Sequence, residues 1–111
     1  MVIRVWRAWA LDGDPAGYRR HFEAVVRPEL IEVAGFRGAL VLERQVGDEV
    51  EIVVETRWAS LGAVAAFAGD DLGRAVVEPG ARAVLSRADE RVVHYEVVTE
   101  VAASDGSAAS R

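Results

Sequence analysis

The stretch of residues 36–58 reads FRGALVLERQVGDEVEIVVETRW and decides the fold. It contains two runs rich in Val, Ile and Leu, residues 36–46 and residues 49–58, and only Gly47 and Asp48 separate them. Such a pair of residues between two apolar runs is typical of a two-residue β-hairpin turn. The stretch therefore predicts two antiparallel strands joined by a tight turn.

The turn also sets the register of the hairpin, and the register assigns every side chain to one of two faces. It pairs Val46 with Glu49, Arg44 with Glu51 and Val41 with Val54. We expect one face to lie under helices, and this face carries Val41, Val50, Ile52, Val54 and Trp58. The opposite face has charges that are expected to pair with one another, and it carries Leu40, Leu42, Val53, Arg44, Glu51, Glu55 and Arg57.

Upstream of the hairpin, residues 2–11 are rich in Val, Ile and Trp and predict a first strand. Trp6 and Trp9 must lie on opposite faces of this strand because their separation is odd, and the sequence leaves open which of them faces the helices. Asp14 is a good N-cap for the helix that follows. Pro28 is expected to kink this helix or to end its first segment.

Downstream of the hairpin, Ser60 is expected to cap the next helix. Residues 72–77 and 81–87 predict two further short helical segments, and residues 91–99 predict the last strand. Residues 100–111 are mostly Ala, Ser, Gly and Asp, so we expect a disordered tail.

This order of elements is β-α-β-β-α-β, the ferredoxin-like α+β arrangement, in a single domain of residues 1–99. Its antiparallel sheet carries helices on one face only. The other face leaves Leu40, Leu42 and Val53 in water unless something covers them. A second copy of the same sheet is the simplest cover, so we predict a symmetric homodimer.

The composition excludes several classes of protein. The 111 residues include no cysteine and all 13 basic residues are arginine, so disulfides, thiolate chemistry and lysine Schiff bases are excluded. A formal net charge of −5 without a basic stripe argues against a nucleic-acid partner. No apolar run is long enough for a membrane span and the N-terminal stretch lacks a signal-peptide layout, so we expect a cytoplasmic protein. The two His residues lie far apart, so we expect no metal, and no motif indicates a cofactor.

Several segments resemble the antibiotic biosynthesis monooxygenase-type family, and together they span residues 2–98. They are VIRVWRAW at residues 2–9, GFRGA at residues 35–39, WASLGAV at residues 58–64, RAVV at residues 74–77, DER at residues 89–91 and HYEV at residues 94–97. The resemblance implies a dimeric α+β barrel with a ligand cavity between each sheet and its own helices. It also implies two known chemistries, cofactor-independent oxidation of polyketide quinone precursors by O₂ and oxidative opening of haem.

The sequence departs from this family where the known chemistry resides. Both branches use an Asn, and this chain has no Asn. The position of the helical Trp of the haem-degrading branch falls near Phe67, and the position of its His falls near Val76 or Val77. Haem degradation is therefore disfavoured, and neither reaction can be carried over residue by residue.

Five residues are candidates for the site. Trp58 closes the hairpin on the helix-facing side, where it either stacks on a flat aromatic ligand or serves as a core aromatic. His94 titrates near neutral pH and is the candidate base or orienting donor, or else a polar side chain bonded across the dimer barrel. Tyr18, Phe22 and Phe67 would wall the cavity from the helix side, and core packing explains them equally well.

Three functions are compatible with the sequence. The first is cofactor-independent oxidation of a small aromatic or enolic substrate by O₂, in which the substrate carbanion supplies the electrons. The second is a non-catalytic module of the same fold that binds a small ligand or a partner. The third is a haem-binding protein.

Overall fold

Strand β1 lies inside an antiparallel sheet and pairs with three other strands. The computed structural model describes residues 1–103, and its strands lie in the order β2-β3-β1-β4, with β5 also paired to β1. The strands are β1 (Val2–Ala10), β2 (Phe36–Val46), β3 (Glu49–Trp58), β4 (Leu85–Ala88) and β5 (Val93–Glu96). This is the ferredoxin-like strand order, so the predicted α+β fold class is confirmed.

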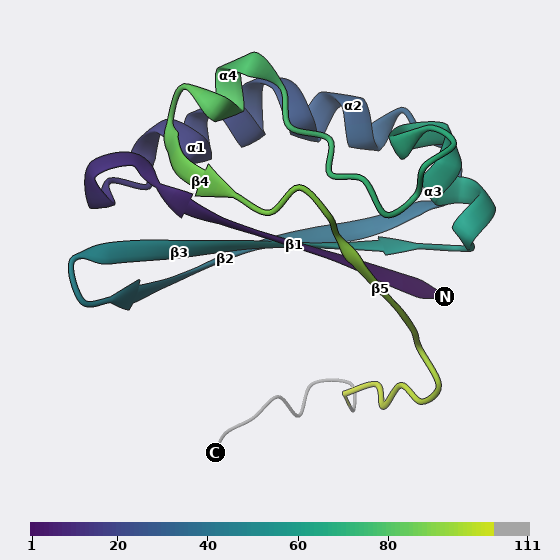
Figure 1. Ribbon diagram of the computed structural model, residues 1–111. Helices are drawn as coiled ribbons and strands as arrows, with labels where there is room; N and C mark the ends of the chain where they lie inside the picture. Colours follow the sequence, from purple (N-terminus) through teal and green to yellow (C-terminus); the bar gives the residue numbers. More distant parts are fainter. Residues whose placement is uncertain (104–111) are drawn as a thin grey trace.

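The helices cover one face of the sheet, and within residues 1–103 the other face carries none (Figure 1). They are α1 (Ala16–His21), α2 (Arg27–Ile31), α3 (Leu61–Ala68) and α4 (Pro79–Arg82), and a short 3₁₀ turn, η1 (Leu11–Gly13), follows β1. A π-helical turn, η2 (Phe22–Val26), joins α1 to α2 without a break.

The helix that crosses the sheet does not end at Pro28. The N–H of Arg27 donates to the carbonyl of Phe22, five residues earlier, so the helix widens just before the proline. A proline has no N–H for the regular helical bond, and the wider turn precedes the position where that bond is lost. At the start of the helix, Pro15 occupies the N-cap position instead of the predicted Asp14, and Asp14, one residue earlier, accepts a hydrogen bond from the N–H of Ala16 at 2.9 Å.

The hairpin has the register that its two-residue turn predicts. The pairs Val46–Glu49, Arg44–Glu51 and Val41–Val54 are all present. The residues expected to face the helices include the buried residues Val50, Ile52, Val54 and Trp58. On β1, Trp6 lies opposite Val54 and is buried on the same side. Trp9 therefore lies on the helix-free face, which answers the question that the sequence left open.

The segment between α3 and β5 differs from the prediction. Residues 72–77 form no helix, because Ala75 donates its N–H to the carbonyl of Glu90 instead of to a helical partner. Residues 81–87 are not one helix either, since α4 ends and β4 begins within them. β4 supplies hydrogen-bond partners to the edge of β1, which would otherwise be unpaired. The last strand is shorter than the predicted residues 91–99.

The helix-free face exposes apolar side chains, as the sequence predicts. Leu40, Leu42 and Val93 are 46%, 44% and 52% exposed, and Val53 is partly buried among them. A surface of this kind is unusual for a sheet that stays in contact with water. The homodimer and its barrel remain a prediction.

Two further predictions concern the ends of the domain and its helices. The predicted tail covers residues 100–111, of which residues 104–111 lie outside the described residues. The boundary of the domain at residue 99 therefore stays a prediction. Among the helices of residues 1–103, none has the length and apolar character needed to cross a membrane.

Replacing Gly35 with Ala is expected to destabilise the fold. Gly35 has φ of +89°, and an added Cβ would lie 2.6 Å from the Cβ of Ala63 in α3. The left-handed backbone and the overlap together predict a loss of about 2 kcal/mol or more in the free energy of unfolding. Gly62→Ala is the control, because its new Cβ meets nothing closer than 3.6 Å and Ala favours a helix. Urea unfolding measures both, and equal stabilities of the two variants would contradict the prediction.

Candidate functional site

A cavity of about 50 Å³ lies between the sheet and the helices, where the sequence resemblance implies a ligand cavity. Its aromatic walls are Trp6 and Phe67, and its polar groups are Arg4, Tyr18, Thr56 and Glu78. This volume is enough for a few water molecules. Pockets for drug-sized ligands are several times larger. An aromatic ligand must therefore displace side chains such as Val76, which lies on the segment between α3 and α4.

Alternation along two paired strands brings one wall of the cavity together. Arg4 lies opposite Thr56 and Trp6 lies opposite Val54 in the ladder between β1 and β3. Residues that face each other in such a ladder point to the same side of the sheet. The sheet thus supplies a cation, an indole and a hydroxyl to one small volume.

Arg4 is a buried cation that contacts only neutral groups. Its side chain donates to the carbonyls of Leu72 at 2.6 Å and Arg74 at 2.9 Å, and its Nη1 lies 3.1 Å from Nε2 of His94. Within residues 1–103 it forms no ion pair, and it is 4% exposed. Burial lowers the pKa of Arg4 to about 10, so the guanidinium remains charged at neutral pH.

His94 is the hydrogen-bond partner of Arg4. A guanidinium has no acceptor, so Nε2 must be the unprotonated nitrogen and the proton of the neutral ring must lie on Nδ1. Burial, and then the charge of Arg4, lower the pKa of His94 below its ordinary value. His94 lines a separate surface hollow and not the cavity. Its predicted role as a base requires Arg4 to release Nε2.

Tyr18 reaches the cavity from α1, as the sequence predicts. Its ring lies 5.8 Å from the Trp6 ring, and the residue is buried. Burial, and then the nearby charge of Glu78, raise the pKa of Tyr18, so its hydroxyl stays protonated. The phenol is therefore a hydrogen-bond donor to whatever occupies the cavity.

Trp58 is a core residue in this structure. It is fully buried, and its indole N–H donates to Oγ1 of Thr56 at 2.8 Å. Its ring packs against Phe36 and Phe67, with ring centroids 5.5 Å and 5.7 Å apart. Phe67 lies in the cavity wall and Trp58 does not. Stacking of a ligand on Trp58 requires Phe67 to move.

Phe22 lies apart from the other predicted wall residues. It is buried in η2 and lines an open groove between the helices and β2, together with Phe36 and Val41. Its ring lies 6.4 Å from the ring of Tyr18, so it supports that side chain from behind. The structure thus brings Tyr18 and Phe67 together at the cavity and leaves Phe22 outside it.

Among the polar and aromatic residues of the cavity wall, sequence reasoning missed Arg4, Trp6, Thr56 and Glu78. The signal for Arg4 was its spacing, because Arg4 and Trp6 both lie at even positions of β1, and its even positions from Arg4 to Ala10 are buried. The sequence alone did not decide whether the even-numbered or the odd-numbered residues of this strand face the helices. Glu78 had no signal, since it falls between the two predicted helical segments, residues 72–77 and 81–87.

The comparisons with known proteins agree with this architecture. The chain matches no protein-family model and no curated protein sequence. Among solved structures, a Bacillus cereus protein named as a candidate antibiotic biosynthesis monooxygenase has a TM-score of 0.64 and 21% identity, over 92% of this chain and 97% of its own. The haem degrader MhuD of Mycobacterium tuberculosis, with two haems bound in its active site, has a TM-score of 0.60 and 25% identity, over 92% and 100% of the two chains.

A third structure is SnoaB of Streptomyces nogalater, a cofactor-independent oxygenase, with a TM-score of 0.58 and 15% identity over 90% of this chain and 96% of its own. These likenesses are likenesses of fold. The chain has the fold of the antibiotic biosynthesis monooxygenase-type proteins, so the resemblance seen in the sequence is confirmed at that level.

The residues of the cavity do not fit a haem held by histidine. The two His residues of the chain are His21 and His94, and neither lines the cavity. Among residues 1–103, no three His, Cys, Asp or Glu side chains are grouped as metal ligands. The cavity instead presents hydrogen-bond donors and one carboxylate to an organic ligand.

The pKa of His94 is expected to lie below the ordinary value of 6.5 and to rise in Arg4→Gln, because the neighbouring positive charge is removed. As pH falls below about 6.5, the unfolded chain takes up a proton at His94 before the folded chain does, so stability falls. His94→Gln should remove that part of the acid destabilisation. NMR titration of the imidazole and urea unfolding at several pH values measure these effects. A His94 pKa that is unchanged by Arg4→Gln would contradict the assigned contact.

Proposed function

We propose that the protein is a cofactor-independent oxygenase that oxidises a small aromatic or enolic substrate with O₂. One observation carries the proposal: a cavity between sheet and helices that combines aromatic walls with Arg4, Tyr18 and Glu78. SnoaB, a cofactor-independent oxygenase, shares the fold. The convergence of a few polar groups on an otherwise apolar cavity is typical of a binding site for a small molecule.

The proposed reaction balances without a cofactor. A CH₂ group between activating rings loses a proton, and the resulting carbanion, stabilised as an enolate, supplies electrons to O₂. One oxygen atom becomes the new carbonyl and the other leaves as water, so CH₂ and O₂ give C=O and H₂O. No external reductant is needed.

The residues take the following proposed roles. Tyr18 donates a hydrogen bond to the substrate oxygen, and Phe67 and Trp6 hold its ring. Glu78 lies in the cavity wall and is placed to accept a proton, whereas His94 orients Arg4. Trp58 supports Phe67 and Thr56 unless the ligand displaces Phe67, and Phe22 supports Tyr18.

A second function is favoured by the volume of the cavity. About 50 Å³ is little room, because side chains of the chain fill most of the space between sheet and helices. This favours a non-catalytic module of the same fold that binds a small ligand. Ligand binding without turnover distinguishes it from the oxygenase. The third function, haem binding, has no support from the cavity, because no His lines it.

The wild-type protein is expected to consume O₂ with anthrone as substrate and to form the corresponding quinone. Tyr18→Phe should lower kcat/KM about tenfold or more, since the hydrogen bond to the developing oxyanion is lost. Phe67→Ala and Trp58→Ala should weaken the reaction by loosening the wall. An oxygen electrode and the absorbance of the quinone measure turnover.

Tyr95→Phe is the matched control, because Tyr95 is 57% exposed and lies outside the cavity. Its activity should equal that of the wild type. If Tyr18→Phe and Tyr95→Phe oxidise anthrone as fast as the wild type, the cavity is not the place of reaction. Binding without any O₂ uptake would favour the non-catalytic module.

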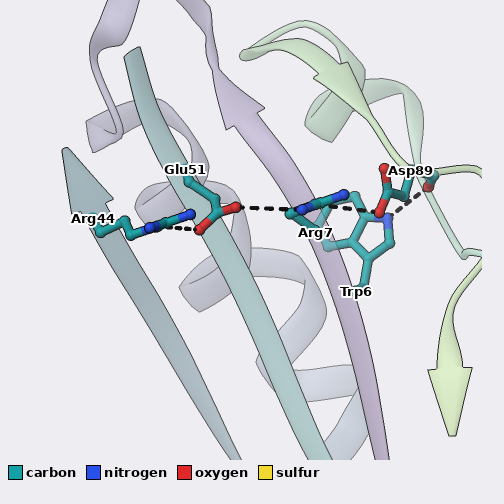
Figure 2. A network of polar contacts seen from close by, with 5 residues as sticks. All are labelled: Trp6, Arg7, Arg44, Glu51 and Asp89. Atoms are coloured by element: carbon teal, nitrogen blue, oxygen red, sulfur yellow. Dashed lines mark hydrogen bonds and ion pairs between the residues drawn. The ribbon is translucent and has the colours of Figure 1, made fainter. Parts of the chain in front are cut away.

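We also propose that the helix-free face is covered by a second copy of the chain. Its support is the exposed apolar surface around Leu40 and Leu42, which adjoins a row of charges across the sheet (Figure 2). In this row Arg44 donates to Glu51 at 2.7 Å, and Arg7 lies 3.7 Å from Glu51 and 3.5 Å from Asp89. Alternating charges beside an apolar patch specify one orientation of a partner sheet.

The row of charges is held firmly at its centre. The side chain of Glu51 is 8% exposed although it lies on the helix-free face. The hydrogen bond from Arg44 and the charge of Arg7 keep the pKa of Glu51 below its usual value. At the end of the row, the carbonyl of Asp89 accepts the indole N–H of Trp6, which ties this face to the cavity on the other side (Figure 2).

The chain is expected to sediment as a homodimer at micromolar concentration. Leu42→Arg should shift it toward the monomer, because it places a charge in the apolar patch. Leu61→Arg is the control, since Leu61 in α3 is 47% exposed, close to the 44% of Leu42, but lies on the helix side. Sedimentation velocity measures both variants. A wild-type chain that sediments as a lone folded subunit would contradict the dimer.

A further inference from the structure

Three polar or charged residues of the described chain are buried, and only one of them lacks a matching partner. Glu51 has Arg44 and Arg7, and Thr56 has the indole of Trp58. Arg4 has only carbonyl oxygens and a neutral imidazole. A buried charge is normally paired with an opposite charge, because taking it out of water is costly. The absence of a negatively charged partner beside Arg4 among residues 1–103 therefore calls for an explanation.

We propose that Arg4 is the binding site for the negatively charged oxygen of the ligand that occupies the cavity. The inference rests on the proposed function in placing a ligand in this cavity, and it adds the class of that ligand: a flat organic anion. The charge is carried either by an ionised enol or phenol or by a carboxylate, since both present the same anionic oxygen to a guanidinium.

The hydrogen bonds of Arg4 leave part of its side chain available. A guanidinium has five N–H donors, and the three contacts of Arg4 use Nη1 twice and Nη2 once. No contact within residues 1–103 engages Nε. Every fully buried side-chain nitrogen or oxygen of these residues has a hydrogen-bond partner, so Nε is not sealed off and remains accessible. Arg4 lines the cavity, which is where an incoming oxygen atom can meet it.

The same three contacts hold the guanidinium in place before a ligand arrives. Leu72 and Arg74 lie on the segment after α3, and His94 lies on β5, so the group is fixed from two elements. A donor that is already oriented loses little freedom when it binds, which favours affinity. Neutral partners also leave the positive charge uncompensated for the ligand.

The rest of the cavity suits a flat body attached to that oxygen. Trp6 lies beside Arg4 on β1, and Phe67 lies across the cavity on α3. Tyr18 donates a second hydrogen bond, because its raised pKa keeps it protonated. Glu78 is the carboxylate in this wall, and it forms no ion pair with Arg4 within 4.0 Å, so it does not occupy the place of the ligand.

Equilibrium binding of matched probes to the full chain tests this inference. Benzoate and its neutral analogue benzamide form one arm, and 4-nitrophenolate and its neutral analogue 4-nitroanisole form the other. Wild type should bind each anion about tenfold or more tightly than its neutral analogue, as expected for a charge-assisted hydrogen bond. Arg4→Gln should abolish the preference, and Arg4→Lys, which keeps the charge, should retain part of it. Arg20→Gln, which removes an exposed charge from α1, should bind like the wild type.

The indole N–H signals in NMR spectra locate the bound anion. The signal of Trp6 should shift on titration with benzoate or 4-nitrophenolate, whereas that of Trp9, on the opposite face, should not. This readout uses the wild-type protein, so it decides the matter even if Arg4→Gln does not fold. Preference for benzoate alone identifies a carboxylate, and preference for 4-nitrophenolate alone identifies an enolate or phenolate.

The inference is wrong if neither anion binds, if the anions and their neutral analogues bind equally, or if the preference survives in Arg4→Gln. Its failure is separate from the failure of the oxygenase proposal. An anion that binds at Arg4 without O₂ uptake in the anthrone assay leaves the inference standing and overturns the proposed reaction. If O₂ uptake is unchanged in Arg4→Gln and the wild type shows no preference for anions, the proposed reaction stands and the inference about Arg4 is wrong.

Discussion

The alignment of three strands, β2 against β3 and β3 against β1, is the constraint on which the remainder of the molecule depends. Side chains alternate along each strand, so a slip by one residue would exchange the two faces of the sheet. The turn at Gly47 and Asp48 prevents that slip in the hairpin. With this register, one face is packed under helices and the other is left for water or a partner. Both proposed binding surfaces follow from this division.

The cavity exists because the side chains of the sheet and those of the helices leave a small gap between the two layers above β1 and β3. The sheet contributes Arg4, Trp6 and Thr56 from alternate positions, and the helices contribute Tyr18 and Phe67. The segment between α3 and α4 closes the space, and Arg4 is bonded to two of its carbonyls. One residue therefore anchors the cover of the cavity and carries the charge inside it. A cover without regular secondary structure can be displaced at lower cost than a packed helix.

The two faces of the sheet are also linked to each other. The indole of Trp6 lies in the cavity wall and donates to the backbone of Asp89, whose carboxylate belongs to the row of charges on the helix-free face. Arg7, one residue after Trp6, completes that row. A partner that orders the row would therefore also hold the segment that carries one wall of the cavity. The proposed assembly and the proposed ligand binding therefore share structural elements, although they use opposite faces of the sheet.

The difference between what was predicted and what was not has a physical origin in the range of the interactions. The hairpin, its register and the exposed Leu40 and Leu42 follow from local turn chemistry and from the period of two along a strand. Tyr18 and Phe67 were found because amphipathic helices turn their aromatic side chains inward. Trp58 and Phe22 were expected at the same place, but close packing put Phe67 and Tyr18 in front of them. The local pattern of residues 72–77 and 81–87 predicts helices, but a local pattern contains no information about distant hydrogen-bond partners. In the structure, Ala75 bonds to Glu90, and β4 pairs with the edge of β1.

By itself, the sequence determined the hairpin, its register and the side of the hairpin that needs covering, because each of these depends on neighbours within a few residues. Only the tertiary structure decided that Arg4 is buried, that His94 bonds to it through Nε2, and that Glu78 reaches the cavity. These facts join residues separated by up to 90 positions in the chain. The reason is that burial and charge pairing depend on which segments pack together, and no local pattern specifies that choice.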